Sequence, residues 1–314
     1  MKTQYPSYYP RFHCIASACK HTCCAGWEID VDEVTLARYQ TMPEGEREAI
    51  LSTISNEGIP HFALQGACER CPHLDDTGLC RIIARYGEAY TPNICRDHPR
   101  YRHMLTDGVE YGVGLACEAA CQLILGTQER VSIGIPEGQA PLSYTEEEQE
   151  LIDVRQELRA QLQDRALPIQ KRFHLMCEKM GMAEDSLPLH SLLGWYDVLE
   201  YQSREWAEGL ASIQEKQDAT LFFRSENALY FEQLTLYFIH RHLLDALEDG
   251  YVEERVAFSL LSSYLIALLA TTIAGEKTDF ERICEAARIY STEIEYSTEN
   301  TDILLENLSE ILWG

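Results

Sequence analysis

The stretch Cys14–Cys24, CIASACKHTCC, sets the character of this chain, because four cysteines fall within eleven residues. Four thiolates so close in sequence can converge on one soft metal ion if the chain loops around it. Adjacent side chains tend to diverge, so Cys23 and Cys24 can serve different sites or different irons. The stretch therefore predicts a metal-binding loop.

The cysteine pattern continues well beyond this loop. The further members are Cys68, Cys71 and Cys80 in CERCPHLDDTGLC, Cys95 in NICRDHPR, and Cys117 and Cys121 in LACEAAC, with only Cys177 and Cys284 outside. A single cysteine is most often a buried thiol, but ten within 108 residues favour metal ligation. Zinc and iron–sulfur clusters both take four thiolates, so the pattern leaves the metal open.

The compartment follows from the start of the chain. The first residues, MKTQYPSYYPRF, lack the apolar run of a secretory signal. We therefore expect a cytoplasmic protein whose cysteines are reduced, where a dense cysteine pattern indicates metal binding rather than disulfides.

One apolar run approaches the length of a membrane span. Val256–Ala274 is uncharged over 19 residues, close to the ~20 that a bilayer requires. It contains several Ser and Thr residues and has acidic flanks, so we interpret it as the central helix of a soluble bundle. Membrane spanning is not expected.

The charge of the chain is strongly negative and uneven. Residues 1–125 hold 11 Lys and Arg against 16 Asp and Glu, and residues 126–314 hold 15 against 35, which together give the net charge of −25. Such a chain repels a phosphate backbone, so we expect no nucleic-acid partner. An acidic face could attract a cationic partner, although solvated helix surfaces are the simpler interpretation.

Composition divides the chain near Gly126–Pro141. We expect a mainly α protein, with a small irregular cysteine-rich metal-binding module over residues 1–125 and an α-helical domain over residues 126–314. In the module, short helices are expected at 31–41 and 44–55. The segment Gly58–Gly114 has few ways to form an apolar core, so metal ligation would stabilise it.

The second domain shows helical periodicity throughout and no useful strand pattern. A capping box at Ser143–Glu146 and a cap at Thr278 mark two helix starts. The other expected helices are 168–181, 188–214, 226–248, 252–274 and 300–312.

One helix of this domain carries an unexpected charge. Tyr237, Arg241 and His242 lie on an otherwise apolar segment, and a buried unpaired Arg241 would be costly. Glu295 is the expected partner. The group is either an ion pair that ties two helices together or part of a substrate site.

Several of these strings together resemble one known family. FHCIASACKHTCCAGWEID, CPHLDDTGLCRIIARYGE, ICRDHPR and LACEAA, with LYFIHRHLLDAL and IEYSTEN downstream, are similar to the flagellin lysine-N-methylases of the FliB family. The resemblance implies transfer of methyl groups from S-adenosylmethionine to lysines of flagellin, with an iron–sulfur cluster required. The positions that match the cysteine pattern of the family are Cys14, Cys19, Cys23, Cys24, Cys71, Cys80, Cys95 and Cys117. Cys68 and Cys121 are additional to it.

The resemblance also suggests roles for other residues. Arg96 and Arg100 could hold the carboxylate of S-adenosylmethionine bidentately, or form local salt bridges. Tyr237, His242 or Glu295 could help a substrate lysine to lose its proton, but no catalytic residue stands out. The chain has neither the glycine-rich fingerprint of common methyltransferases nor the C-x3-C-x2-C loop of radical S-adenosylmethionine enzymes.

We therefore predict a protein-lysine N-methylase with a 4Fe-4S cluster, or zinc as the alternative metal. The alternative function is a non-catalytic protein-binding module that zinc or a cluster stabilises. A third possibility is an electron-transfer or redox-sensing protein.

Overall fold

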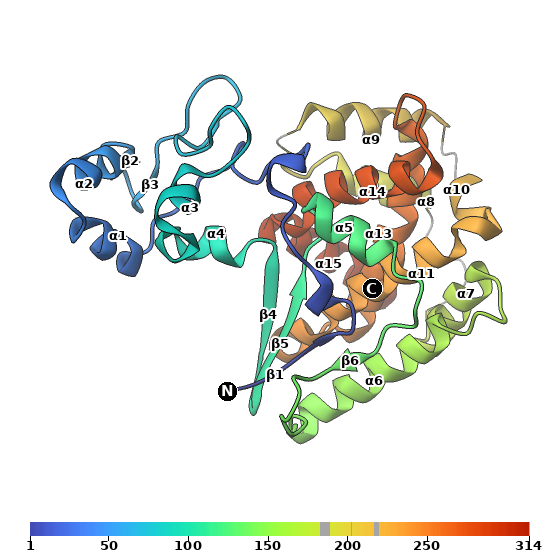
Figure 1. Ribbon diagram of the computed structural model, residues 1–314. Coiled ribbons are helices and arrows are strands. Elements are labelled where there is room, and N and C mark those ends of the chain that lie inside the picture. The colour runs from blue at the N-terminus through green and yellow to red at the C-terminus, as the bar shows by residue number, and fades with distance from the viewer. Residues whose placement is uncertain (183–188, 202, 217–219, 314) are drawn as a thin grey trace. The chain divides into compact units, whose positions relative to one another are not determined.

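A computed structural model of the chain describes residues 1–182, 189–201, 203–216 and 220–313. It separates into two compact units (Figure 1). Unit 2 is the continuous segment His13–Arg100, and unit 1 combines Met1–Phe12 with Tyr101–Gly314. The division differs from the boundary expected near Gly126–Pro141, because the first strand of the chain pairs with strands that follow the cysteine-rich segment.

Unit 1 contains a small mixed sheet that the sequence analysis did not predict. Its strands are β1 (Lys2–Pro6), β4 (Arg100–Leu105), β5 (Gly108–Val113) and β6 (Ile133–Gly134), in the order β4-β5-β1-β6. β1 runs parallel to β5 and antiparallel to β6. Position 108 requires glycine, because a Cβ there would lie 2.4 Å from the carbonyl oxygen of Lys2 in the neighbouring strand.

The rest of unit 1 is helical, as expected. Its α-helices are α5 (Glu118–Leu125), α6 (Glu146–Leu162), α7 (Ile169–Lys179), α8 (Leu189–Tyr196), α9 (Arg204–Lys216), α10 (Thr220–Phe223), α11 (Ala228–His242), α12 (Ala246–Asp249), α13 (Val252–Thr272), α14 (Asp279–Tyr290) and α15 (Thr298–Trp313). The helix expected at 188–214 is two helices, α8 and α9, and residues 188 and 202 lie outside the described residues.

Two capping boxes start helices of unit 1. Thr278 and Glu281 form the reciprocal pair that begins α14, which confirms the expected cap. The box ahead of α6 joins Thr145 to Glu148 and not Ser143 to Glu146, a shift of two residues along the same polar run.

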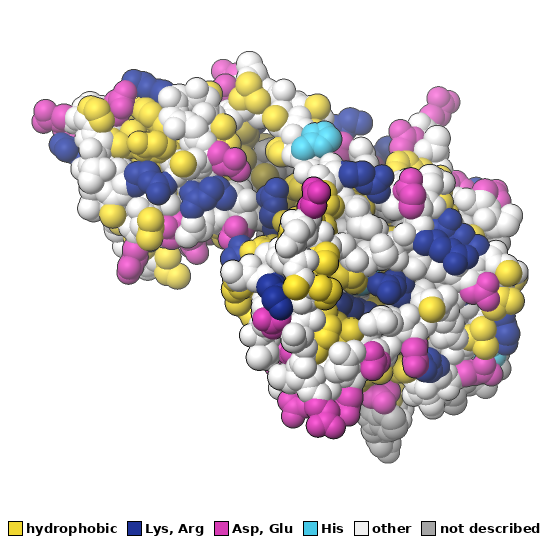
Figure 2. Space-filling view, turned by 60° about the horizontal axis from the view of Figure 1, so that its bottom comes forward, with side chains coloured by type: hydrophobic (Ala, Val, Ile, Leu, Met, Phe, Trp, Pro, Cys, Tyr) yellow, Lys and Arg dark blue, Asp and Glu magenta, His cyan; other side chains and the backbone are white. Residues whose placement is uncertain are grey.

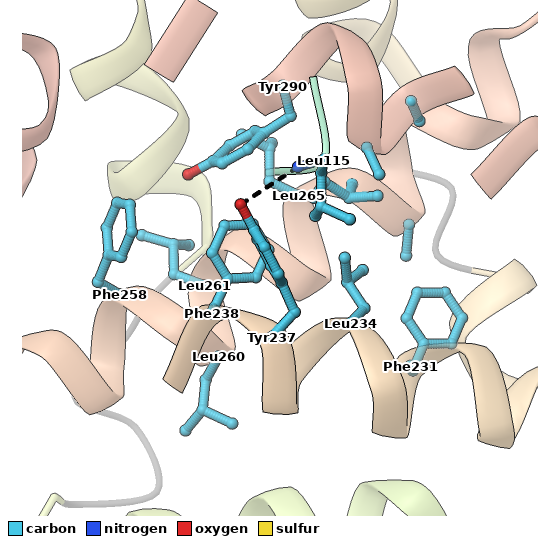
Figure 3. Packing of buried hydrophobic residues seen from close by; sticks show 14 of the residues in the cluster. Leu115, Phe231, Leu234, Tyr237, Phe238, Phe258, Leu260, Leu261, Leu265 and Tyr290 are labelled. Atoms are coloured by element: carbon cyan, nitrogen blue, oxygen red, sulfur yellow. Dashed lines mark hydrogen bonds between the residues drawn. The ribbon is translucent and has the colours of Figure 1, made fainter. Parts of the chain in front are cut away.

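The core of unit 1 forms around α13, which packs against α11, α14 and α15. Figure 3 shows the aromatic rings of Phe238, Phe258 and Tyr290 interleaved with leucines at this junction. α13 is long and apolar enough to cross a membrane, and 83% of its apolar window is buried inside the structure. Most of α13 is therefore packed within unit 1, the position expected of an apolar helix at the centre of a bundle.

Unit 2 is a smaller and less regular module. Its elements are α1 (Glu33–Gln40), α2 (Glu44–Leu51), β2 (Ile54–Ser55), β3 (His61–Phe62), α3 (Arg81–Tyr86) and α4 (Asn93–Asp97). α1 and α2 confirm the two short helices expected there. β2 and β3 form an antiparallel pair.

Unit 2 also has an apolar core of its own, which corrects one expectation. Its buried members are Ile29, Val31, Tyr39, Met42, Ile50, Phe62, Cys71, Leu74 and Ile82. Several of them come from Gly58–Gly114, the segment expected to lack such a core. Hydrophobic burial therefore contributes to the stability of this unit whether or not a metal is bound.

Candidate functional site

Unit 2 brings separate cysteine segments together through its backbone. The N–H of Cys71 donates to the carbonyl of Cys24 at 2.8 Å, and an antiparallel bridge pairs Leu74 with Cys80. Cys80 is the N-cap residue of α3, and Cys95 lies in α4. Cys24 and Cys80 also pack against the core to which Cys71 belongs.

Four of these thiols lie close enough for their charges to interact. Burial raises the pKa of Cys95 to about 12, and the charges of Cys24, Cys71 and Cys80 add to the shift. Burial likewise raises the pKa of Cys71 to about 11. The pKa of Cys24 instead falls to about 7, chiefly through a hydrogen bond with Cys23 that outweighs burial. We name Cys24, Cys71, Cys80 and Cys95 the thiol cluster.

The thiol cluster is not arranged as a finished ligand set. Within the described residues, no group of three or more His, Cys, Asp or Glu side chains is placed so that it could hold a metal ion. The donor chemistry nevertheless fits a soft metal, since four thiols of one module share one neighbourhood. These thiols would have to move closer together to ligate one metal.

The other predicted cysteines are not members of the thiol cluster, although Cys23 forms a hydrogen bond with Cys24. Cys14 and Cys23 are exposed and Cys19 is half-buried in the first loop of unit 2. Cys117 belongs to unit 1, where it is the N-cap residue of α5. No disulfide joins any of the twelve cysteines, all of which lie in the described ranges. The eight-cysteine metal site stays a prediction.

The guanidinium of Arg96 is held by its own loop. It donates to the carbonyl of Thr91 and to the side-chain oxygen of Asn93. Arg100 in turn donates to the carbonyl of Arg96 at 3.1 Å. The expected pair of arginines thus contacts local oxygens, and its proposed role in holding a ligand carboxylate is not tested by these contacts.

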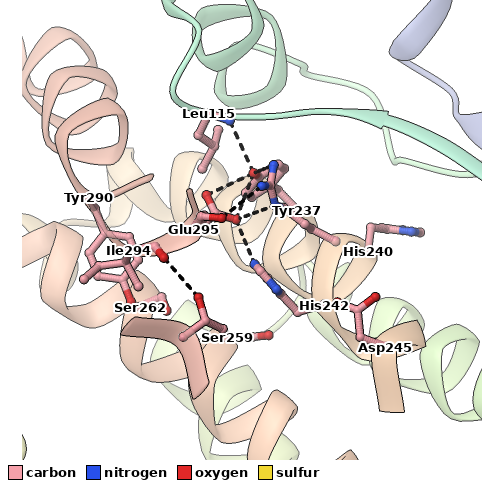
Figure 4. A network of polar contacts seen from close by, with 12 residues as sticks. Leu115, Tyr237, His240, His242, Asp245, Ser259, Ser262, Tyr290, Ile294 and Glu295 are labelled. Carbon is pink, nitrogen blue, oxygen red and sulfur yellow. Dashed lines mark hydrogen bonds and ion pairs between the residues drawn. The ribbon is translucent and has the colours of Figure 1, made fainter. Parts of the chain in front are cut away.

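In unit 1, four predicted residues meet in one buried polar group, the Glu295 cluster (Figure 4). Oε1 of Glu295 lies 3.0 Å from Nε of Arg241 and 2.8 Å from Nε2 of His242. The hydroxyl of Tyr237 donates to the same carboxylate at 3.0 Å and accepts from Nη1 of Arg241 at 3.1 Å. The expected pairing of Arg241 with Glu295 is confirmed.

The local backbone explains how Glu295 reaches this position. Residues Ser291–Glu295 form a π-helical segment between α14 and α15. Such segments are rare and occur frequently at functional sites, because the wider turn re-aims a side chain. Here the segment directs Glu295 toward Arg241 and His242 of α11.

Charge and burial oppose each other in the Glu295 cluster. The side chain of Glu295 is 0% exposed, and burial alone would raise its pKa. Arg241 and the His242 hydrogen bond outweigh burial and hold the pKa of Glu295 below its usual value. Burial lowers the pKa of His242 and raises that of Tyr237 well above the ordinary value. At neutral pH the group therefore contains one carboxylate, one guanidinium, a neutral imidazole and a neutral phenol.

Two aromatic rings lie close to the guanidinium of Arg241. Its guanidinium carbon lies 5.0 Å from the ring centroid of Tyr101 and 5.3 Å from that of Tyr296, within the range of cation–π attraction. A Cβ at Gly112 would meet the Tyr101 ring at 2.1 Å, so glycine is needed there to seat the ring. Sequence reasoning missed Tyr101, because a strand residue gives no helical signal.

The amide of Leu115 completes the group. Its N–H donates to the Tyr237 hydroxyl at 3.3 Å (Figure 3). The loop ahead of α5 is thus joined to α11 through Tyr237.

A second buried ion pair lies in the same unit and was also missed. Arg155 donates to both oxygens of Glu110 at 2.6 and 2.7 Å, and Gln4 donates to Glu110 at 2.6 Å. Nδ1 of His240 lies 3.9 Å from Oε1 of Glu110. Burial lowers the pKa of His240 to about 4. Through Gln4, Glu110 and Arg155 these contacts connect β1, β5 and α6, so we assign them a structural role.

Charged side chains of both signs are visible on the face drawn in Figure 2. On the face drawn in Figure 2, acidic side chains are scattered over unit 1 with Lys and Arg between them. This face thus supports the interpretation of the negative charge as solvated helix surface.

The fold, with the thiol cluster in unit 2 and the Glu295 cluster in unit 1, defines a mainly helical protein with a separate cysteine-rich module. Three curated proteins are similar to it. The chain is 29% identical to the flagellar biosynthetic protein FliU of Salmonella muenchen over 139 residues, which are 41% of this chain and 80% of FliU. It is 28% identical to the lysine-N-methylases of Salmonella typhimurium and Salmonella choleraesuis over 134 residues, 41% of this chain.

The chain is therefore a distant homologue of the FliU and lysine-N-methylase (FliB) proteins. The matched region spans only 33% of the length of the two lysine-N-methylases. No family model matches the chain, and no solved structure matches it.

Proposed function

We propose that this chain is a protein-lysine N-methylase that uses S-adenosylmethionine and acts on a protein substrate in the cytoplasm, with flagellin as the first candidate. The observation that carries the proposal is the homology to two lysine-N-methylases and to a flagellar biosynthetic protein.

The chemistry of such a transfer constrains the site. A lysine has a reference pKa of ~10.4 and must lose its proton before its nitrogen can attack a methyl group. A neutral amine held in line with the methyl sulfonium needs little further help, so positioning and exclusion of water would supply most of the rate.

In this proposal the Glu295 cluster has a structural role and is not the catalytic base. Its carboxylate is already paired with Arg241 and His242, and a base paired in this way cannot readily take a further proton. We therefore assign the cluster to positioning α11 against α14 and α15, with the exposed Tyr296 at its outer edge.

The thiol cluster is the proposed metal site. Cys24, Cys71, Cys80 and Cys95 would supply four thiolates to an iron–sulfur cluster, with zinc as the alternative metal. When bound, an iron–sulfur cluster supplies either structural ligation or an electron. Cys14, Cys19 and Cys23, which also match the cysteine pattern of the family, are the proposed ligands of a second site in the same unit.

Methylation is tested with protein purified without oxygen and incubated with flagellin and methyl-labelled S-adenosylmethionine. Label on lysine without a reductant would indicate direct transfer, and label only with a reductant would indicate a radical route. Absence of both label and S-adenosylmethionine binding would refute the methylase proposal.

The second candidate is a non-catalytic protein-binding module that a metal stabilises. The observation that favours it is the short matched region, which spans only 33% of the length of each lysine-N-methylase. Metal analysis separates the candidates. Brown protein with iron and sulfide supports the methylase, whereas colourless protein with stoichiometric zinc and no methyl transfer supports the binding module.

A further inference from the structure

Two cysteines outside the thiol cluster meet in the core of unit 1. Cys121 on α5 is 1% exposed and Cys284 on α14 is 8% exposed. The thiol of Cys121 donates to the carbonyl oxygen of Cys284 at 3.4 Å. The two helices pack directly against each other, so the two side chains share one small space between them.

We propose that Cys121 and Cys284 are an oxidative modification site that closes to an intramolecular disulfide when the protein meets a peroxide. In the first step one thiol, exposed by local opening between the helices, loses its proton to water. The resulting thiolate attacks the peroxide O–O bond, which gives a sulfenic acid and releases hydroxide. In the second step the other thiol attacks the sulfenic sulfur and releases water. In sum, two thiols lose two electrons and two protons, and one hydrogen peroxide becomes two waters.

Such a disulfide would link the two chain segments that contact the Glu295 cluster. α5 follows the Leu115 amide, which bonds Tyr237. α14 runs directly into the π-helical segment that ends at Glu295. A covalent link between α5 and α14 would therefore fix the two chain segments that hold the cluster. This inference does not depend on methyl transfer.

The bridge would form slowly and would stabilise the fold. Both thiols are buried, so reaction must wait for local opening between the helices. Because the two residues are 163 positions apart in sequence, the bridge closes a long loop and restricts the unfolded chain strongly. We expect the melting temperature of unit 1 to rise by several degrees after oxidation and to return after dithiothreitol.

The test treats the whole purified protein with hydrogen peroxide, blocks remaining thiols, and maps tryptic peptides without reduction. We expect the peptide ICEAAR, which contains Cys284, joined to the peptide that contains Cys117 and Cys121. Fragment ions distinguish these two cysteines without any substitution.

Variants provide the matched comparison. Cys121→Ser should abolish both the cross-link and the rise in melting temperature, whereas Cys177→Ser, which removes a half-buried thiol from α7, should leave both. The proposal is overturned if wild-type protein keeps both thiols reduced, oxidises each to a sulfinic acid, or links Cys284 to a cysteine other than Cys121.

Discussion

Replacement of Glu295 by alanine should destabilise unit 1 severely. The substitution removes a carboxylate that is 0% exposed and that pairs with Arg241, which is itself only 12% exposed. Arg241 would remain buried without its counter-charge. Breaking a buried pair in this way costs about 3–5 kcal/mol, a large part of the stability of an ordinary domain.

Two further variants separate charge from packing at this position. Glu295→Gln also removes the counter-charge of Arg241, but its amide oxygen still accepts a hydrogen bond. We therefore expect a smaller loss than for alanine, of about 1.5–3 kcal/mol. The double variant Glu295→Leu with Arg241→Met removes both charges. It should cost less than the sum of the two single changes, because no unpaired charge is left.

The assay is urea unfolding at pH 7, followed by tryptophan fluorescence, to which the fully buried Trp206 of the same unit contributes. Glu299→Ala is the matched control, since it removes an exposed glutamate four residues along the chain and should change the free energy of unfolding by no more than about 0.5 kcal/mol. A loss below about 1 kcal/mol for Glu295→Ala, or strict additivity in the double variant, would refute the reasoning.

Three further predictions follow from buried or capping groups. Burial holds the pKa of His73 and of His240 near 4, whereas in the unfolded chain these histidines bind a proton near pH ~6.5. Lowering the pH from about 6.5 toward 4 should therefore reduce the free energy of unfolding by roughly 1.4 kcal/mol per pH unit for each of the two histidines. Stability that fails to fall in a pH titration of urea unfolding would contradict this. Thr278→Ala removes the cap of α14 and should cost about 1 kcal/mol, measured by the same unfolding assay. Cys71→Ser should lose bound metal in elemental analysis, whereas Cys177→Ser should retain it; equal loss from both would remove the thiol cluster as the metal site.

The helical body could be predicted because its signals are local. Apolar spacing and caps such as Thr278 act within one or two turns, so a helix start can be identified without knowledge of the tertiary fold. The partner of Arg241 could also be predicted, since a charge on an apolar helix requires a counter-charge.

The small sheet could not be predicted in the same way. Its strands are at most six residues long, and β1 finds its partner β5 about a hundred positions further along the chain, as in the pair of Lys2 with Gly108. Short strands give too little alternation to identify. A composition shift near Gly126 therefore suggested a boundary that the packing does not follow.

The cysteine pattern shows most clearly where sequence spacing stops being informative. Clustering along the chain groups Cys117 with the other cysteines, whereas the structure places it in unit 1 at the start of α5. Its role as a metal ligand therefore stays a prediction. The adjacent Cys23 and Cys24 can serve different sites, and it is Cys24 whose charge adds to the pKa shift of Cys95. Proximity in the fold is decided by backbone pairing, such as the bond from Cys71 to Cys24. We therefore expect the ligand set of this module to follow such backbone contacts, and metal analysis of Cys71→Ser tests that expectation.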